Sequence, residues 1–426
     1  MVRFIHAADI HLDSPMLQLE HYEGAPADEI RRSTRRALTN LIDLAIEKQV
    51  DFVLIAGDLY DGDWPDHNTG LFFTSEVARL RAAEIPLYFI SGNHDAANKL
   101  TKALPLPTNP DGSPVQLSST KVDSVILEDL GVAIHGRGFR KQAETDNLSE
   151  KYPRATRDLL NIGMLHTSLQ GAQGHAPYAP CTPQQLADKE YDYWALGHIH
   201  IREDRAIEGS CPIVFSGNTQ GRSVRETGAK GCVLVELDPI APPKLEFQPL
   251  DVCRWEICEI DATEIDRIDD LIQQCKTRMQ AICANNPDRT SIVRVRVVGQ
   301  TPLYSTLQAR LEHWQSVMRQ ETFDIDEGSI WMERLRVKAT APREAITYDA
   351  SGPIGELLQT IGSVSADPDA MAAIQSALEP LVAKLPIELV EDGDGVAWNH
   401  QDQIRQWLDE AEPLLLNRLA TLEADV

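Results

Sequence analysis

The chain lacks long apolar runs. None reaches the roughly 18 residues that a membrane-crossing helix needs, so no membrane span is expected. The first residues lead directly into a polar motif at Asp9 and leave no room for a signal peptide. We therefore expect a cytoplasmic protein with no membrane partner.

Cysteine is also sparse, with seven residues among 426. No two of them form a Cys-x-x-Cys pair, the spacing typical of zinc sites. An odd number in a chain of this length does not suit a disulfide framework. We expect buried or free thiols of a reducing compartment at all seven positions. These are Cys181, Cys211, Cys232, Cys253, Cys258, Cys275 and Cys283.

Basic residues are outnumbered by acidic ones, 40 to 65, which gives a net charge of −25. Because phosphate contacts require Lys and Arg, this balance argues against a general nucleic-acid binder. The charge is uneven, however, since residues 341–426 hold 4 basic and 16 acidic side chains. Local basic groups occur earlier, at 31–36, 137–141 and 222–225. The overall charge therefore disfavours a nucleic-acid substrate without excluding it.

At 426 residues the chain is too long for one small core, so we expect more than one domain. Apolar runs at 2–8, 52–56 and 86–90 predict strands, and helical periodicity at 28–49 and 66–83 separates them. This alternation predicts an α/β domain built from crossover units.

Strands dominate the next part of the chain, up to residue 237. Two sheets packed face to face, with helices outside, would account for them. The proline-rich stretch 238–244 is the best candidate for a linker. The segments beyond it predict a small α/β domain without a metal-ligand cluster, followed by a helical segment. We therefore expect an α/β or α+β protein with domains at 1–240, 250–340 and 350–426.

Five short polar clusters are the most informative feature that is present, and each follows an apolar run predicted to be a buried strand. They combine carboxylate, imidazole and amide groups, the mixture that holds two divalent metals side by side. One cluster alone would mean little, but five within the first 200 residues predict a dinuclear phosphoesterase. They read ADIHLD at 8–13, IAGDLYD at 55–61, ISGNHD at 90–95, MLHTS at 164–168 and ALGHIH at 195–200.

The clusters supply ligands for two metals. Asp58, in a Gly-Asp turn, is our candidate for the carboxylate that bridges both ions. Asp9 and His11 lie two residues apart at a strand end, so they point to the same side and can bind the first metal. Mixed oxygen and nitrogen ligands favour Mn²⁺, Fe or Zn²⁺ over Ca²⁺. The remaining candidates are His200 for the first metal, and Asn93, His166 and His198 for the second.

His94 adjoins Asn93, and we expect it to remain free of metal. A histidine in this place can protonate the leaving oxygen as a general acid. Such a histidine needs a carboxylate that holds its orientation and charge state. Asp61 and Asp95 are the available carboxylates.

Two further groups of residues stand apart from the clusters. The arginines at 31–36 form either a solvated helix face or a phosphate contact, and both alternatives stay open. The histidines without a cluster around them are expected to be structural or solvated. The arginines are Arg31, Arg32, Arg35 and Arg36, and the histidines are His6, His21, His67, His135, His175, His313 and His400.

The order of the motifs resembles the calcineurin-like metallophosphoesterase superfamily over residues 1 to about 235. The segments FIHAADIHLD, IAGDLYD, ISGNHD and YWALGHIH look like those of the SbcD/Mre-type DNA repair nucleases. The stretch His135–Phe139 and the chain length are more similar to the YhaO branch of that group. The resemblance implies a four-layer sandwich of two mixed β-sheets flanked by helices.

The resemblance also implies a function. Members hydrolyse DNA with Mn²⁺, as exonucleases and often as endonucleases, commonly pair with an SMC-like ATPase of the SbcC type, and often form homodimers. His94 would be the catalytic residue, and we favour Asp61 as the residue that orients it. The small domain would cap DNA, and the helical segment would bind the ATPase. The implied metal ligands are Asp9, His11, Asp58, Asn93, His166, His198 and His200.

The leading hypothesis is a Mn²⁺-dependent DNA repair exonuclease. The alternative is a phosphodiesterase or nucleotidase for small phosphoesters, which the acidic charge favours. The residues beyond the first domain favour the nuclease, because an enzyme for small substrates rarely needs a capping domain and a helical segment. A scaffold with a vestigial metal site is disfavoured, since every expected ligand and His94 are present.

Overall fold

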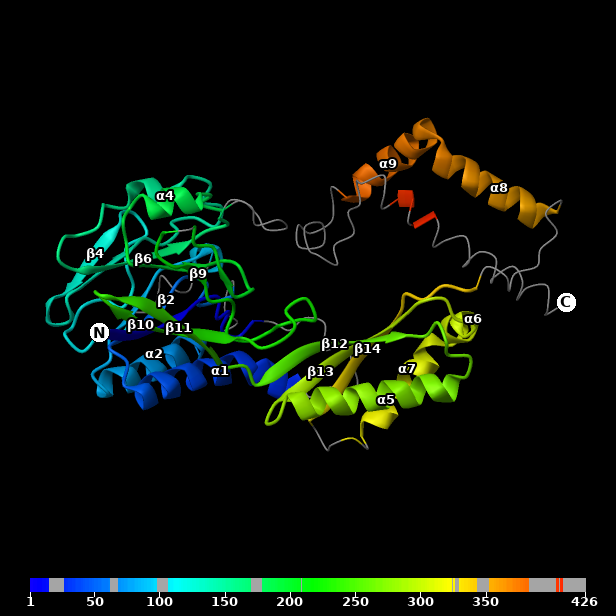
Figure 1. Cartoon of the computed structure of the whole chain (residues 1–426), viewed down its shortest axis with the longest axis horizontal. Coiled ribbons are helices and arrows are strands. Elements are labelled where there is room, and N and C mark those ends of the chain that lie inside the picture. The colour runs from blue at the N-terminus through cyan, green and yellow to red at the C-terminus, as the bar shows by residue number, and fades with distance from the viewer. Residues whose placement is uncertain are drawn as a thin grey trace. The chain divides into compact units, whose positions relative to one another are not determined.

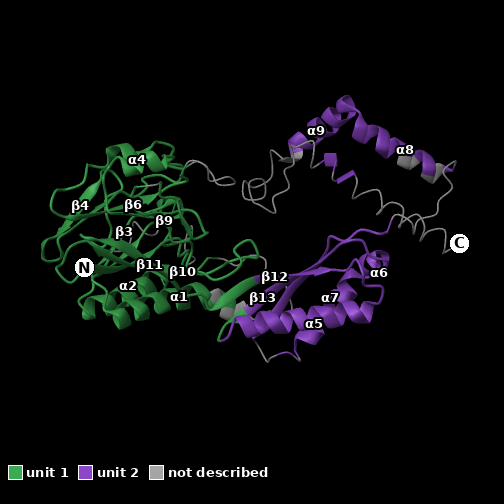
Figure 2. Cartoon of the chain, in the orientation of Figure 1, with its two compact units in different colours: residues 1–255, 288–290 green, residues 256–287, 291–426 purple. Residues whose placement is uncertain are grey.

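The computed structural model forms two compact units (Figure 2). Unit 1 comprises Met1–Trp255 with Asp288–Thr290, and unit 2 comprises Glu256–Pro287 with Ser291–Val426. None of the seven cysteines is in a disulfide bond, in agreement with the prediction. Within the described residues, no helix is long and apolar enough to cross a membrane. The structure describes residues 1–14, 27–61, 68–97, 106–169, 178–207, 209–323, 325, 329–342, 352–382, 404–405 and 407–408.

The first sheet of unit 1 is mixed and follows the predicted alternation of strands and helices. Its strands are, in spatial order, β11 (Ala241–Pro249), β10 (Gly231–Asp238), β1 (Val2–Ala7), β2 (Phe52–Ile55) and β3 (Leu87–Phe89). The last three run parallel, whereas β10 pairs antiparallel with β1 and β11. Helices α1 (Ala27–Lys48) and α2 (Asn68–Ala82) cover one face, through apolar side chains such as Leu41 and Phe73 (Figure 1).

The second sheet of unit 1 is also mixed. Its strands are, in spatial order, β4 (Asp123–Leu127), β5 (Val132–Gly136), β6 (Leu160–His166), β7 (Tyr193–Gly197), β9 (Ile213–Phe215) and β8 (Glu203–Asp204). The four from β5 to β9 run parallel, and the two edge strands are antiparallel to their neighbours. Its outer face packs against short helical turns, which are α4 (Pro183–Ala187) and η2 (Leu148–Lys151). A further turn, η1 (Glu128–Leu130), joins β4 to β5.

The two sheets pack face to face around a shared apolar core. Phe4 and Phe52 of the first sheet stack at 4.9 Å and meet Tyr193 of the second. Neighbouring residues such as Ile5 point to the helical side instead, so the strands are apolar on both faces, as buried parallel strands are. The fold class is therefore confirmed as an α/β sandwich of four layers.

The predicted linker at 238–244 is wrong. The chain turns at residue 239 and returns as β11, which pairs with β10 from Asp238↔Ala241 to Gly231↔Pro249. Pro242 and Pro243 suggested a linker, but β11 is an edge strand, where a missing N–H need not cost a ladder bond.

The following residues form a three-stranded sheet, β12 (Cys253–Asp261), β13 (Thr290–Val298) and β14 (Ile330–Val337), in that order. Helices α5 (Ile268–Asn285) and α7 (Leu311–Thr322) share a core with it, and α6 (Tyr304–Ala309) precedes α7. Helix was expected beyond residue 350, and α8 (Pro353–Ala366) and α9 (Pro368–Val382) confirm it where the chain is described. Among the described residues of unit 2, no three His, Cys, Asp or Glu side chains gather at metal-binding distance.

Candidate metal centre

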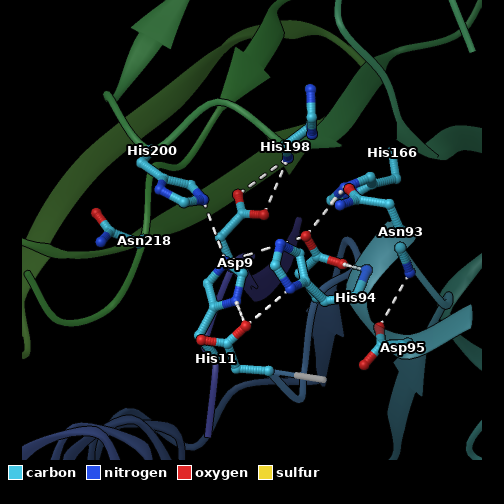
Figure 3. Close-up of polar contacts among 12 residues, drawn as sticks. Asp9, His11, Asn93, His94, Asp95, His166, His198, His200 and Asn218 are labelled. Atoms are coloured by element: carbon cyan, nitrogen blue, oxygen red, sulfur yellow. Dashed lines mark hydrogen bonds and ion pairs between the residues drawn. The ribbon is translucent and has the colours of Figure 1, made fainter. Parts of the chain in front are cut away.

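The predicted polar clusters lie at the carboxyl ends of strands in both sheets. They follow β1, β2 and β3 in the first sheet, and β6 and β7 in the second. Parallel strands bring their carboxyl ends to one edge of a sheet. The two edges meet where His166 Nδ1 donates to the Ala56 carbonyl at 3.0 Å, and where Asp9 accepts the His198 backbone N–H at 3.0 Å. Figure 3 shows the resulting cluster.

The backbone leaves these strands in a conformation that disfavours most side chains. Asp9, His11, Asp58 and His198 have φ of 50°, 46°, 49° and 99°. Such strain costs free energy and gathers at functional sites. Space is also tight, because a Cβ added to Gly57 would lie 2.2 Å from His166 Nδ1. The fold thus accepts local strain to hold these side chains at the sheet edge.

Six of the predicted site residues come within metal-binding distance of one another. They form three overlapping groups, and within each group the candidate ligand atoms all lie within 4.8 Å of one another. The groups are Asp9, His11 and His200; then His11, Asp58 and His94; then Asp9, Asp58 and His166. Asp9, His11 and Asp58 each belong to two of the groups, so these three residues lie at the centre of the cluster.

The other two predicted ligands, Asn93 and His198, are in none of the three groups. Asn93 begins the short helix α3 (Asn93–Ala97), and its Oδ1 lies 3.0 Å from His166 Nε2. The His198 ring is in none of the three groups and lies 5.2 Å from the His166 ring, centroid to centroid. The structure therefore brings Asn93 into the cluster and sets the His198 imidazole beside it.

The protonation pattern of His166 fits a cation. A carbonyl oxygen can only accept, so Nδ1 carries the proton that His166 donates to Ala56. Nε2 faces Asn93 Oδ1 at 3.0 Å and Asp58 Oδ2 at 3.4 Å. Burial lowers the pKa of His166, but Asp58 and Asp9 outweigh burial and raise it to about 9, so Nε2 holds a proton that a metal ion could replace. His166 Nε2, Asn93 Oδ1 and Asp58 Oδ2 converge on one point, so a proton or a metal ion must lie between these three atoms.

His11 and His200 form a second such arrangement. His200 Nδ1 lies 2.7 Å from Glu226 Oε1, to which it donates, so its Nε2 lone pair points at His11 Nε2, 3.1 Å away. His11 Nδ1 has no hydrogen-bond partner, although Asp61 Oδ1 lies 3.7 Å away. Burial and the nearby Arg222 lower the pKa of His11 to about 3, so its ring is neutral at pH 7. Two facing ring nitrogens and a buried carboxylate fit a divalent metal.

The carboxylates at the centre are fully buried. Burial raises the pKa of Asp9, and the negative charge of Asp58 adds to this effect. Burial also acts on Asp58, but His166, His94 and His11 outweigh it and hold its pKa well below the usual range. Buried like charges repel each other, and cations between them would relieve that repulsion.

His94 differs from the buried histidines in its exposure. Its side chain is 37% exposed, against 0% for His11 and His166. His94 Nδ1 lies 2.8 Å from Asp61 Oδ1 and donates to it. Burial lowers the pKa of His94, but Asp61 and Asp58 outweigh burial and raise the pKa above its usual value. Asp61 thus holds the partly exposed His94 ring through one of its two nitrogens.

Asp95 contacts the backbone and not His94. It accepts three backbone N–H groups, at 2.9 to 3.2 Å, from the loops after β2 and β3. Burial and the Asp58 charge raise the pKa of Asp95 to about 6. Of the two carboxylates considered from the sequence, Asp61 is therefore the one in contact with His94.

Sequence reasoning missed Arg222 and Glu226 as site residues. The Arg222 guanidinium lies 3.2 Å from Asp61 Oδ2 and 3.1 Å from Glu226 Oε1, and these carboxylates raise its pKa against the effect of burial. One cation thus links the carboxylate that holds His94 to the one that holds His200. The sequence did hold a signal for this region, because FSGN at 215–218 repeats the pattern of an apolar run followed by a Gly-Asn turn seen in ISGNHD. That signal lies just before Arg222 and Glu226 and does not include them.

The arginines and histidines outside the clusters are either held by contacts within the protein or exposed, where the structure describes them. Arg35, whose side chain is 34% exposed, binds Asp13 through two contacts of 2.6 Å. Arg32 and Arg36 are exposed. His6 and His135 are buried and hydrogen-bonded, and His313 lies against Trp314, as predicted for structural or solvated histidines. The Arg31 side chain and His21, His67, His175 and His400 lie outside the described residues.

Comparison with known proteins agrees with this geometry. Residues 2–202 match the family described as calcineurin-like phosphoesterase, and residues 255–340 match the middle domain of the metallophosphoesterase YhaO. An uncharacterized metallophosphoesterase YhaO from Bacillus subtilis is 33% identical over 338 residues, which cover 78% of this chain and 80% of that protein.

More distant relatives include the DNA double-strand break repair protein Mre11 of Sulfolobus acidocaldarius. It is 24% identical over 311 residues, covering 71% of this chain and 76% of that protein. A solved structure, a dimetal phosphatase from Danio rerio, is 12% identical and covers 56% of this chain and 93% of its own, with a TM-score of 0.34. The chain therefore belongs to the calcineurin-like metallophosphoesterases, hydrolases of phosphoester bonds, in the branch that carries a YhaO-type middle domain.

Proposed function

We propose that this protein is a metal-dependent DNA exonuclease that acts in repair and can also cut internally. The observation that carries the proposal is the pairing of a buried ligand cluster with the half-exposed His94, which Asp61 holds at 2.8 Å. The similarity to Mre11 proteins, named for DNA double-strand break repair, supports DNA as the substrate.

The proposed metals are two divalent cations, with Mn²⁺ as the expected ion. Such a pair would neutralise the phosphate oxygens and lower the pKa of the attacking water. Asp58 would lie between the ions. The other proposed ligands are Asp9, His11, Asn93, His166, His198 and His200.

The protein's own groups then provide the proton. Water attacks the phosphorus, the bond to the leaving oxygen breaks, and His94 Nε2 donates its proton to that oxygen. Asp61 keeps the other ring proton on Nδ1 and stabilises the charged ring before transfer. Arg222 holds Asp61 in place from the opposite side. The raised pKa of His94 keeps it protonated closer to neutral pH, as this role requires.

We further propose partners and domain roles from the Mre-type resemblance. Residues 250–340 would cap DNA, residues 350–426 would bind an SMC-like ATPase of the SbcC type, and the nuclease domain, 1–240, would form a homodimer. Small phosphoesters are the second candidate substrate, because a net charge of −25 disfavours long-range attraction of DNA.

One assay separates the two candidates. Purified protein with Mn²⁺ is given labelled linear DNA and, separately, bis-p-nitrophenyl phosphate. We expect both to be cleaved. If the dye ester is hydrolysed while DNA stays intact, even with a partner ATPase added, the nuclease proposal is wrong and the small-substrate candidate stands.

A further inference from the structure

A pocket of about 350 Å³ adjoins the metal centre and shares His200 with it. The loops after β7 and β9 line it together with β10 and β11. Its twelve lining residues include Arg202, Arg225 and Lys230, and none is Asp or Glu. In a chain with 65 acidic and 40 basic residues, this composition favours an anionic ligand.

Asn218 lines this pocket, and its side-chain amide has a fixed orientation. Its Nδ2 donates to Gln220 O and to Glu226 Oε2, both at 2.9 Å. Both partners are acceptors, so the amide cannot be flipped. Asn218 is fully buried, and its Oδ1 has no hydrogen-bond partner. A buried acceptor without a partner costs free energy, and a ligand that donates an N–H or O–H would satisfy it.

A flat, cationic stack lies in the same wall. The Arg202 guanidinium lies over the Phe247 ring, 5.5 Å from its centroid. Nucleobases stack on aromatic rings and on guanidinium planes. Lys230 also lines the pocket; it is largely buried, and its Nζ donates to the His200 carbonyl at 2.9 Å. The pocket thus combines cations, a stacking surface and an unpaired acceptor next to a proposed metal ligand.

We propose that this pocket binds the nucleotide adjoining the phosphate to be cleaved. The nucleotide phosphate contacts Arg225 and Lys230, the base stacks on Arg202 over Phe247, and a base amine or sugar hydroxyl donates to Asn218. The proposal rests on the proposed function, because His200 places the pocket beside the reacting phosphate. Binding in this pocket makes the enzyme selective for nucleotide esters over other phosphoesters.

The binding test uses the full chain in EDTA, with deoxyadenosine monophosphate, inorganic phosphate and deoxyadenosine as probes. We expect the nucleotide to bind more tightly than either fragment. The double variant Arg202→Gln/Arg225→Gln should weaken nucleotide binding about tenfold, as loss of charge-assisted hydrogen bonds does. The control variant Arg205→Gln, at a residue outside the pocket that directly follows β8, should leave nucleotide binding unchanged. Equal affinity for nucleotide and phosphate, or no effect of the double variant, would overturn the proposal.

A kinetic test separates this inference from the proposed function. Thymidine 5′-monophosphate p-nitrophenyl ester and bis-p-nitrophenyl phosphate release the same leaving group. In the double variant, KM for the nucleotide ester should rise about tenfold more than KM for the dye ester. If the wild type cleaves both and the KM ratio stays constant, the pocket proposal fails while phosphodiester hydrolysis stands. If neither ester is cleaved, the proposed function fails, and the binding test alone decides the pocket.

Discussion

The two units each contain parallel strands with buried charges, but they treat those charges differently. In unit 2, Arg294 Nε on β13 binds Glu333 Oε2 on β14 at 2.7 Å, so each buried charge has an opposite partner. In unit 1, Asp9 and Asp58 lie among imidazoles, and ring nitrogens of His11 and His200 face each other at 3.1 Å. Among the described residues, all eleven non-glycine positions with positive φ belong to unit 1.

This difference shows what turns a sheet edge into a site. Parallel strands can carry buried charges in a stable sheet when those charges are paired, as Arg294 and Glu333 are in unit 2. The edge in unit 1 instead gathers two buried carboxylates and several imidazoles that bound cations would stabilise, on a backbone with positive φ at Asp9, His11, Asp58 and His198. The local inconsistency therefore marks the functional region.

The largest expected effect comes from removing the shared carboxylate. Asp58→Asn keeps the shape of the side chain but removes its charge. Turnover of the dye ester should fall by more than the roughly 100-fold that loss of an outer metal-shell contact costs, and calorimetry should show weaker Mn²⁺ binding. Glu333→Gln, an equally buried carboxylate in unit 2, should lower the unfolding midpoint and leave turnover intact. Equal losses of activity in both variants would erase the contrast between the units.

A somewhat smaller effect is expected for the half-exposed histidine. His94→Ala should lower kcat by about 10²–10⁴-fold, the contribution typical of a general acid. Metal binding measured by calorimetry should be retained, because the proposed ligands are unchanged. Loss of a metal ion together with activity would assign His94 to the ligands.

The third effect concerns Arg222, which links the carboxylates of Asp61 and Glu226. Glu226→Gln should weaken metal binding by about 10- to 100-fold, because it loosens the hold on His200 Nδ1. Arg222→Lys should mainly lower kcat, since a lysine cannot hold Asp61 and Glu226 in the same geometry. Metal titrations and kcat are measured on both variants, and unchanged values in each would give this link a purely structural role.

The smallest effect is a pH dependence of stability in unit 1. His6 is fully buried, and burial lowers its pKa to about 3 against the usual 6.5, although its bond to the Leu196 carbonyl opposes this. The unfolded chain therefore binds the extra proton between pH 6.5 and 3. The contribution of the neutral His6 ring to the free energy of unfolding is therefore fully present above pH 6.5. It is lost as the pH falls towards 3, at about 1.4 kcal/mol per pH unit.

Urea unfolding of unit 1 from pH 7 to pH 5 tests this sign. His6→Gln should be less stable at pH 7 but should respond less steeply to acid than the wild type. His313→Gln, at an exposed position of unit 2, should keep the wild-type slope. A steeper acid response in His6→Gln would contradict the assignment of a buried neutral ring.

Much of the fold and the site could be predicted because the relevant signals are local. An apolar run followed by a Gly-Asp or Gly-Asn turn predicted where β2 and β3 end and which side chains would gather there. The linker at 238–244 failed because prolines look alike in a linker and in an edge strand, and only the pairing of β11 with β10 distinguishes them. Arg222 was missed because its partner Asp61 lies 161 residues away.

The sequence by itself determined the residue types, their order and hence the candidate metal ligands, because strand ends and the side chains that follow them are set by short stretches of chain. Tertiary structure alone decided the partnerships. It placed Asp61 and not Asp95 against His94, set the His198 ring beside the ligand cluster, joined Arg222 to two carboxylates, and opened a basic pocket beside His200. These contacts join segments that are far apart in the chain, and the packing of the two sheets fixes them.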